Sequence, residues 1–122
     1  MKTSRSRTLG LLSVLALSAL ASQASAAGSL TNPEKVVSIQ FDSSSNVFVT
    51  FAVALSGYAC TAANNKTVRF DGSTDQGRTR LALFQGALMS GRKVKVTGTG
   101  ACSGGGTSGY EFLNWMHAFD DL

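Results

Sequence analysis

The chain has 122 residues, of which 43% are hydrophobic, and carries 11 Lys or Arg against 7 Asp or Glu. This length predicts one small domain and argues against an ordinary multi-domain enzyme. Three of the basic residues, Lys2, Arg5 and Arg7, lie near the start, so the remainder from residue 27 has a net charge of about +1. That balance argues against a surface that neutralises many phosphates, and we expect neither nucleic acid nor an anionic membrane as a partner.

Residues 1–26 have the pattern of a secretory signal peptide. A basic start precedes an apolar run at 9–21 and the small-residue sequence Ala-Ser-Ala at 24–26, which is typical of a cleavage site. The apolar run is shorter than the roughly 20 residues that a membrane-spanning helix needs. No Cys beside the cleavage site could carry a lipid. We therefore expect a single mature domain, residues 27–122, that is periplasmic or secreted, with no membrane insertion.

Alternating hydrophobic residues predict the first three strands of the mature chain. After a polar arm at 28–34, which is either loose or the entry to a strand, the alternation at 35–41 and 47–54 predicts two strands. The polar cluster at 42–46 separates them as a turn, so a hairpin is expected. A shorter alternating segment at 66–70 predicts the third strand.

The segment between Ser73 and Gly91 carries the helix signal. Ser73 is the expected N-cap, with Gln76 as its capping-box partner three residues later. Leu81 and Phe84 belong to a series of apolar residues at helical spacing, and Gly91 suits the position just after the last turn. An amphipathic helix is therefore predicted here.

Alternation returns in two later segments. Residues 92–97 and 110–119 predict the fourth and fifth strands, and the glycine-rich stretch at 98–106 predicts a flexible loop between them. About five strands with one α-helix before the fourth indicate a mainly β fold, and an OB-like β-barrel suits this size.

Cys60 and Cys102 are the two cysteines of the chain. In an exported protein they most simply form one intramolecular disulfide. Closing a loop of some forty residues is worth roughly 4 kcal/mol in the chain-entropy model. A redox or metal pair is the alternative, and it would need closer spacing or additional His ligands.

The stretch from Leu81 to Val96, followed by Gly100-Ala101-Cys102, combines a helix, a glycine, a basic strand and a cysteine. In this it resembles small exported bacterial proteins related to the B subunits of subtilase-type and pertussis-like toxins. The resemblance covers about 45 residues and includes a Cys at each end, which those proteins often join. It implies an OB-like barrel, a ring of five subunits and glycan binding on host surfaces. It maps no sugar-contacting residue onto a position of this chain.

Residues suited to catalysis are few. His117 is the single imidazole, and Asp120 and Asp121 follow it, but the sequence places no nucleophile beside it. The adjacent carboxylates do not support a glycosidase pair, and the chain is poor in metal-ligand residues. We therefore expect no enzymatic activity, no catalytic residue, no metal and no cofactor.

Aromatic side chains with a polar end remain as candidates for ligand contact. Trp115, Tyr110 and Tyr58 are of the kind that stacks on sugars or anchors protein interfaces. Packing in the core or in a subunit interface is the alternative, and for Tyr58 packing on the disulfide. The phenylalanines expected in the core are Phe41, Phe48, Phe51, Phe70, Phe84 and Phe112. The basic residues expected on separate solvated faces are Arg69, Arg78, Arg80, Arg92, Lys93 and Lys95.

Two functions from different classes follow from these observations. The first is an exported, non-enzymatic binding module that forms a homo-oligomer such as a pentamer and binds a glycan or a protein receptor. The alternative is a monomeric periplasmic structural or accessory protein with a protein partner. A small hydrolase is a third interpretation, and the missing set of nucleophile, histidine and acid argues against it.

Overall fold

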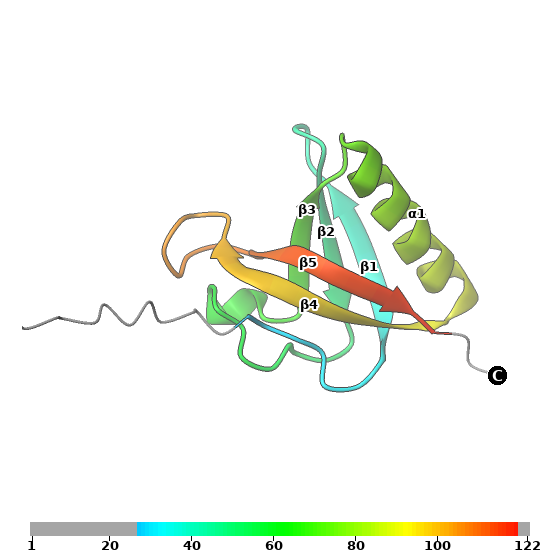
Figure 1. The fold of residues 1–122 in the computed structure, drawn as a ribbon, viewed down its shortest axis with the longest axis horizontal. Helices are drawn as coiled ribbons and strands as arrows, with labels where there is room; N and C mark the ends of the chain where they lie inside the picture. The colour runs from blue at the N-terminus through cyan, green and yellow to red at the C-terminus, as the bar shows by residue number, and fades with distance from the viewer. Residues whose placement is uncertain (1–26, 120–122) are drawn as a thin grey trace, which may run out of the picture.

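The computed structural model describes residues 27–119 (Figure 1). The predicted signal peptide, Asp120 and Asp121 lie outside this range. Within it the chain forms five strands, one α-helix and one short 3-10 helix. Their bounds are β1 (Glu34–Phe41), β2 (Asn46–Phe51), η1 (Ala62–Asn64), β3 (Thr67–Asp71), α1 (Asp75–Ser90), β4 (Lys93–Cys102) and β5 (Glu111–Ala118).

The five strands form a closed ring in the order β1, β2, β3, β5, β4, with β4 pairing back to β1. All neighbouring pairs are antiparallel except β3 and β5, which are parallel. The helix α1 connects β3 to β4 and lies along one side of the ring, next to β1 (Figure 1). The structure thus confirms the predicted mainly β fold, with five strands and one helix before the fourth.

The hydrophobic core fills the inside of the ring. Phe84 of α1 is fully buried there, with its ring centroid 6.2 Å from that of Phe51 and 5.8 Å from that of Phe70. Aromatic contacts of this kind add to the free energy gained by burying the side chains themselves. The remaining core residues are Leu30, Val36, Val47, Val49, Leu55, Val68, Ala87, Val94, Val96 and Leu113.

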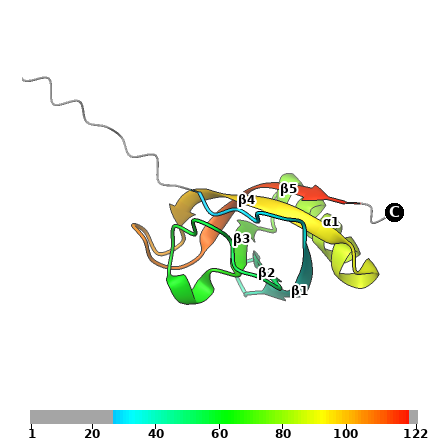
Figure 2. The same cartoon turned by 90° about the horizontal axis from the view of Figure 1, so that it is seen from below.

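The segment directly after residue 27 is hydrogen-bonded to β4 and contributes to the core. Gly28 accepts a hydrogen bond from the backbone N–H of Gly98 through its carbonyl (2.8 Å), and the N–H of Leu30 donates to the carbonyl of Val96 (3.1 Å). Leu30 is only 1% exposed. Figure 2 shows this segment running alongside β4. The sequence left two alternatives for this arm, a loose segment or the entry to a strand. The hydrogen bonds to β4 favour the strand entry.

A buried carboxylate joins this arm to two other segments. Glu111, the first residue of β5, has no exposed surface. Its Oε1 accepts hydrogen bonds from the N–H groups of Gly28 (2.8 Å) and Gly100 (2.9 Å), and its Oε2 accepts one from Ala59 (3.1 Å). A Cβ at Gly98 would collide with this carboxylate. The strand β4 therefore continues through the glycines at 98 and 100, where the sequence predicted a loop.

The helix begins one residue later than predicted. Thr74, not Ser73, is the N-cap, and its Oγ1 accepts a hydrogen bond from the N–H of Gly77 (2.9 Å). Ser73 instead donates to Asp71 Oδ1 from both its N–H (2.8 Å) and its hydroxyl (2.6 Å). The C-terminal prediction is confirmed, because Gly91 adopts the left-handed conformation, with φ of 70°.

The core prediction is wrong for Phe41, which is 56% exposed. It lies at the last position of β1, where the ring ends, and borders a groove of about 390 Å³ together with Leu88 and Met89 of α1. Phe51, Phe70 and Phe84 are buried as predicted. Phe48 and Phe112 are half-buried on the outer face of the ring.

The Cys60–Cys102 disulfide is present, as predicted, and ties the segment after β2 to the end of β4. The two cysteines are 42 positions apart, so in the chain-entropy model the bond stabilises the fold by about 4 kcal/mol. The double variant Cys60→Ser/Cys102→Ser should lose about that free energy of unfolding, measured by urea denaturation. Reduction should produce the same loss in the parent protein and none in the variant. A loss below about 1 kcal/mol would contradict the assigned role of the disulfide.

The hydroxyl of Tyr58 links β3 to the start of β5. It donates to the carbonyl of Thr67 (2.7 Å) and accepts from the N–H of Glu111 (2.9 Å). Burial raises the pKa of Tyr58 above the ordinary value of 10.0. A group whose pKa is raised by folding contributes stability that is present below its unfolded pKa and lost as the pH rises through the folded pKa.

The variant Tyr58→Phe should therefore lose about 1–3 kcal/mol of stability at neutral pH, because it leaves the Glu111 N–H and the Thr67 carbonyl without this partner. The gap in melting temperature between parent and variant should narrow above pH 10.0, where the unfolded tyrosine ionises first. Tyr110→Phe is the matched control, because its ring contact with Phe48 survives the change. A gap that stays constant from neutral to strongly alkaline pH would contradict this assignment.

Candidate binding surface

One row of side chains crosses four strands on the outer face of the ring. The registers pair Gln40 with Phe48, Phe48 with Arg69, and Arg69 with Phe112. Their neighbours along the strands, such as Val47, point into the core. Because side chains alternate between the two faces of a strand, this row points outward.

Aromatic rings flank the arginine of this row. The Arg69 guanidinium carbon lies 5.8 Å from the ring centroid of Phe48 and 5.5 Å from that of Phe112. The Phe48 ring also makes an edge contact with Tyr110, at 4.9 Å between centroids. Cation–π contacts hold a guanidinium in place without using its hydrogen-bond donors. We call Phe48, Arg69, Tyr110 and Phe112 the aromatic–arginine platform.

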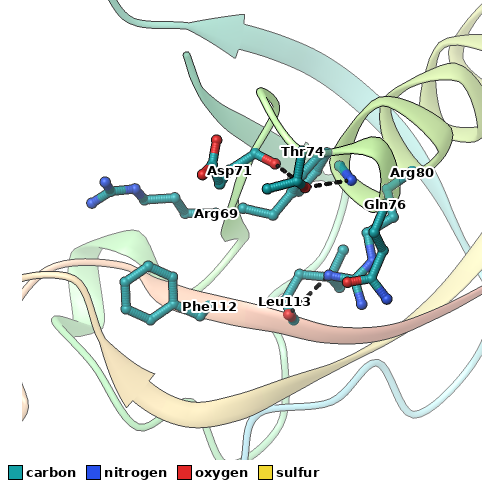
Figure 3. Close-up of a pocket in the computed structure, with 9 residues that line it drawn as sticks. Arg69, Asp71, Thr74, Gln76, Arg80, Phe112 and Leu113 are labelled. Atoms are coloured by element: carbon teal, nitrogen blue, oxygen red, sulfur yellow. Dashed lines mark hydrogen bonds between the residues drawn. The ribbon is translucent and has the colours of Figure 1, made fainter. Parts of the chain in front are cut away.

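A cleft opens beside the platform. The parallel pairing of β3 with β5 covers only two residue pairs, the second being Arg69 with Phe112, and the first turn of α1 occupies the space where the strands separate. The cleft has a volume of about 230 Å³. Figure 3 shows it between β3, β5 and the start of α1. Its lining residues are Arg69, Phe70, Asp71, Thr74, Gln76, Gly77, Arg80, Phe112 and Leu113.

The two arginines at the cleft have different roles. Arg80 donates to the backbone carbonyls of Asn114 (2.7 Å) and Leu113 (3.4 Å), so it fastens α1 to β5. Arg69 extends away from Arg80, on the side where the Phe112 ring lies (Figure 3). Its Nε is buried and has no hydrogen-bond partner among the described residues. Within the described residues, Arg69 is therefore held by the two aromatic rings, whereas Arg80 is held by hydrogen bonds.

The Asp71 carboxylate at the rim of the cleft is held by Ser73, two residues further along the chain. Hydrogen bonds from the hydroxyl and the N–H of Ser73 lower the pKa of Asp71 below its ordinary value of 3.8. Asp71 is therefore ionised at neutral pH. A negative acceptor and the Arg69 donor thus lie on successive outward positions of β3.

The structure separates the three aromatic residues that the sequence proposed for ligand contact. Tyr110 belongs to the platform. Tyr58 uses its hydroxyl inside the fold, between Thr67 and Glu111. Trp115 is 46% exposed and lies next to His117, with 5.9 Å between ring centroids.

Sequence reasoning missed Gln40, Phe48, Arg69 and Phe112 as a group. Because phenylalanine is usually buried, the sequence predicts Phe48 and Phe112 in the core. The alternation in β2 already placed Phe48 on the face opposite Val47 and Val49. The sequence does not show the register of β3 against β2 and β5, and this register places Arg69 between the two rings.

Within residues 27–119, no three His, Cys, Asp or Glu side chains lie close enough together to hold a metal ion. No helix in the same range is sufficiently long and apolar to span a membrane. Comparisons with protein-family models, with curated proteins and with solved structures found no match to this chain.

Proposed function

We propose that this protein is an exported, non-enzymatic binding module that holds a glycan or a protein receptor on its aromatic–arginine platform. The observation that carries the proposal is the position of Arg69 between Phe48 and Phe112 on the outer face of the ring. The inner face of the ring must be apolar for the protein to fold, and valines and phenylalanines make it so. Aromatic rings gathered on the outer face are thus available for recognition.

The chemistry of the platform suits a sugar. Aromatic rings stack on the C–H faces of pyranoses, while a guanidinium and the amide of Gln40 can hydrogen-bond to hydroxyl groups. Asp71 adds a charged acceptor at the adjoining cleft. The corresponding sheet face of OB-folds is a known location for oligosaccharide and oligonucleotide binding. The net charge of about +1 from residue 27 onward favours the sugar over a nucleic acid.

Export and assembly complete the proposal. The disulfide fits an oxidising compartment, and the signal-peptide pattern fits secretion or the periplasm. Exposed Phe41, Leu88 and Met89 border the groove between β1 and α1, and such apolar surface favours association between copies. A ring of five chains is the assembly that the resemblance to toxin B subunits implies. The same groove supports the alternative, a monomeric periplasmic accessory protein whose protein partner covers it.

The first test is the mass of the oxidised mature protein, residues 27–122, in solution. Light scattering should give a mass close to five chains, because a closed pentamer covers the exposed apolar residues of every subunit. A monomer would instead support the accessory-protein alternative. Met89→Glu, at a residue that is 88% exposed, should dissociate the assembly without unfolding the chain.

The second test is a glycan array probed with the parent protein and two arginine variants. Arg69→Ala should reduce binding about tenfold or more, because it removes the central group of the platform. Arg78→Ala is the matched control, since Arg78 is exposed on α1 and pairs only with Asp75 in the described structure (3.7 Å). Equal binding by both variants would contradict the proposed site, and a parent protein that retains no glycan would leave the protein receptor as its ligand.

A further inference from the structure

A second surface combines aromatic and basic side chains on the outer face of β4, β5 and the start of β1. It shares β5 with the platform, and it uses the start of β1, whereas Gln40 lies near the end of that strand. The face lies at the end of the ring where α1 finishes and where β4 begins (Figure 1). We call it the basic–aromatic face; its residues are Lys35, Lys93, Lys95, Trp115, His117 and Phe119.

The three rings of this face follow one another along the end of the chain. The ring centroids of Trp115 and His117 are 5.9 Å apart, and those of His117 and Phe119 are 4.3 Å apart and stacked. A shift in the register between β4 and β5 occurs just before Trp115. After that shift Met116 packs against the core, and its two neighbours point outward.

The lysines lie directly beside these rings. The register of β4 and β5 pairs Lys95 with His117, and the N–H of Phe119 donates to the carbonyl of Lys93 (3.0 Å). On the other side of β4, Lys93 pairs with Lys35 of β1. Ammonium groups and rings thus occupy neighbouring outward positions, whereas Val94, between the two lysines of β4, and Val96, after them, are fully buried.

The lysines of this face form no ion pair within residues 27–119, although Glu34 precedes Lys35 in β1 and pairs with Val94 of β4. The ion pair formed within residues 27–119 joins Arg78 to Asp75 on α1 and involves none of these lysines. The exposed aspartates at 42, 71 and 75 lie at the opposite end of the molecule, by the turn between β1 and β2 and the start of α1 (Figure 1). Asp120 and Asp121 follow Phe119 in sequence and lie outside the described residues. Lys93 and Lys95 both point outward from β4, as the alternation in the sequence predicts for residues that face water.

We propose that the basic–aromatic face binds an acidic glycan, a sugar chain that carries carboxylate or sulfate groups. Trp115 is 46% exposed and offers a flat surface to a sugar ring, while Lys93 and Lys95 lie where they can meet the anionic substituents. Three lysines suit a ligand with a few charges, and they are too few to neutralise a long run of phosphates. An acidic peptide would supply the charge but no ring face to stack on the tryptophan.

Titration calorimetry on the oxidised chain 27–122, which retains Asp120 and Asp121, tests this proposal. The probes are a heparin tetrasaccharide, which carries sulfate and carboxylate groups, a tetragalacturonate, which carries carboxylate groups alone, and neutral cellotetraose. We expect binding of the heparin probe that weakens as salt is raised, and no binding of cellotetraose at this face. Binding of tetragalacturonate as well would show that carboxylates suffice, and its absence would assign the site to sulfated chains.

Variants locate the site. Lys93→Gln/Lys95→Gln should weaken binding of the heparin probe about fivefold or more, and Trp115→Ala about tenfold. Lys66→Gln is the matched control, at an exposed lysine before β3, and should leave the affinity unchanged. Arg69→Ala should weaken binding of the heparin probe less than Trp115→Ala does, which separates this face from the aromatic–arginine platform. Melting temperatures close to that of the parent protein would show that the variants are folded.

Three results would overturn the proposal. The first is an affinity for the heparin probe that is unchanged in the double lysine variant. The second is a loss of binding in Arg69→Ala equal to that in Trp115→Ala, which would place the ligand on the platform. The third is binding to phosphatidylglycerol vesicles in the absence of binding to either acidic oligosaccharide, which would make the face a lipid contact.

Discussion

The carboxylate of Glu111 holds together parts of the chain that the ring of strands alone does not connect. It accepts hydrogen bonds from Gly28, Ala59 and Gly100, which belong to the N-terminal arm, the segment before the disulfide and the end of β4. A buried carboxyl group is costly unless its oxygens are satisfied, and here both oxygens accept hydrogen bonds from backbone N–H groups. The rest of the structure therefore depends on the chain delivering all three N–H groups to one place.

This anchor also determines where the outer surfaces form. Glu111 pairs with Val68 of β3 on one side and with Cys102 of β4 on the other, so it sets the register of β5 against both neighbours. The next residue, Phe112, is thereby placed beside Arg69, which creates the aromatic–arginine platform. Further along β5, the same strand presents Trp115 and His117 beside the lysines of β4. Both proposed binding surfaces thus follow from the position of one buried side chain.

The strands, the helix and the disulfide could be predicted from the sequence, because they are expressed in alternation, in helical spacing and in the cysteine content. Alternation has a limit at β5. It did not predict the burial of Glu111, since an acidic residue in an alternating strand indicates a solvent-facing position. The partners of Glu111 are backbone N–H groups far away in the sequence, and a backbone group leaves no signal in the choice of residue. Gly98 and Gly100 indicated a loop, whereas their missing side chains make room for the carboxylate inside a strand. The position of Arg69 between Phe48 and Phe112 likewise could not be predicted, because it depends on the register of three strands.

The most direct test of this account is amide hydrogen exchange, followed by NMR, in the parent protein and in Glu111→Gln. A glutamine keeps the volume but replaces one accepting oxygen with an NH₂ group. This NH₂ donor then faces a backbone N–H group, which is also a donor. The account predicts faster exchange at Gly28, Ala59 and Gly100 together, and a loss of about 1–3 kcal/mol in the free energy of unfolding. Asp75→Asn, an exposed carboxylate on α1, should change neither quantity. Unchanged protection of the three amides in Glu111→Gln, with unchanged stability, would contradict the central role of this carboxylate.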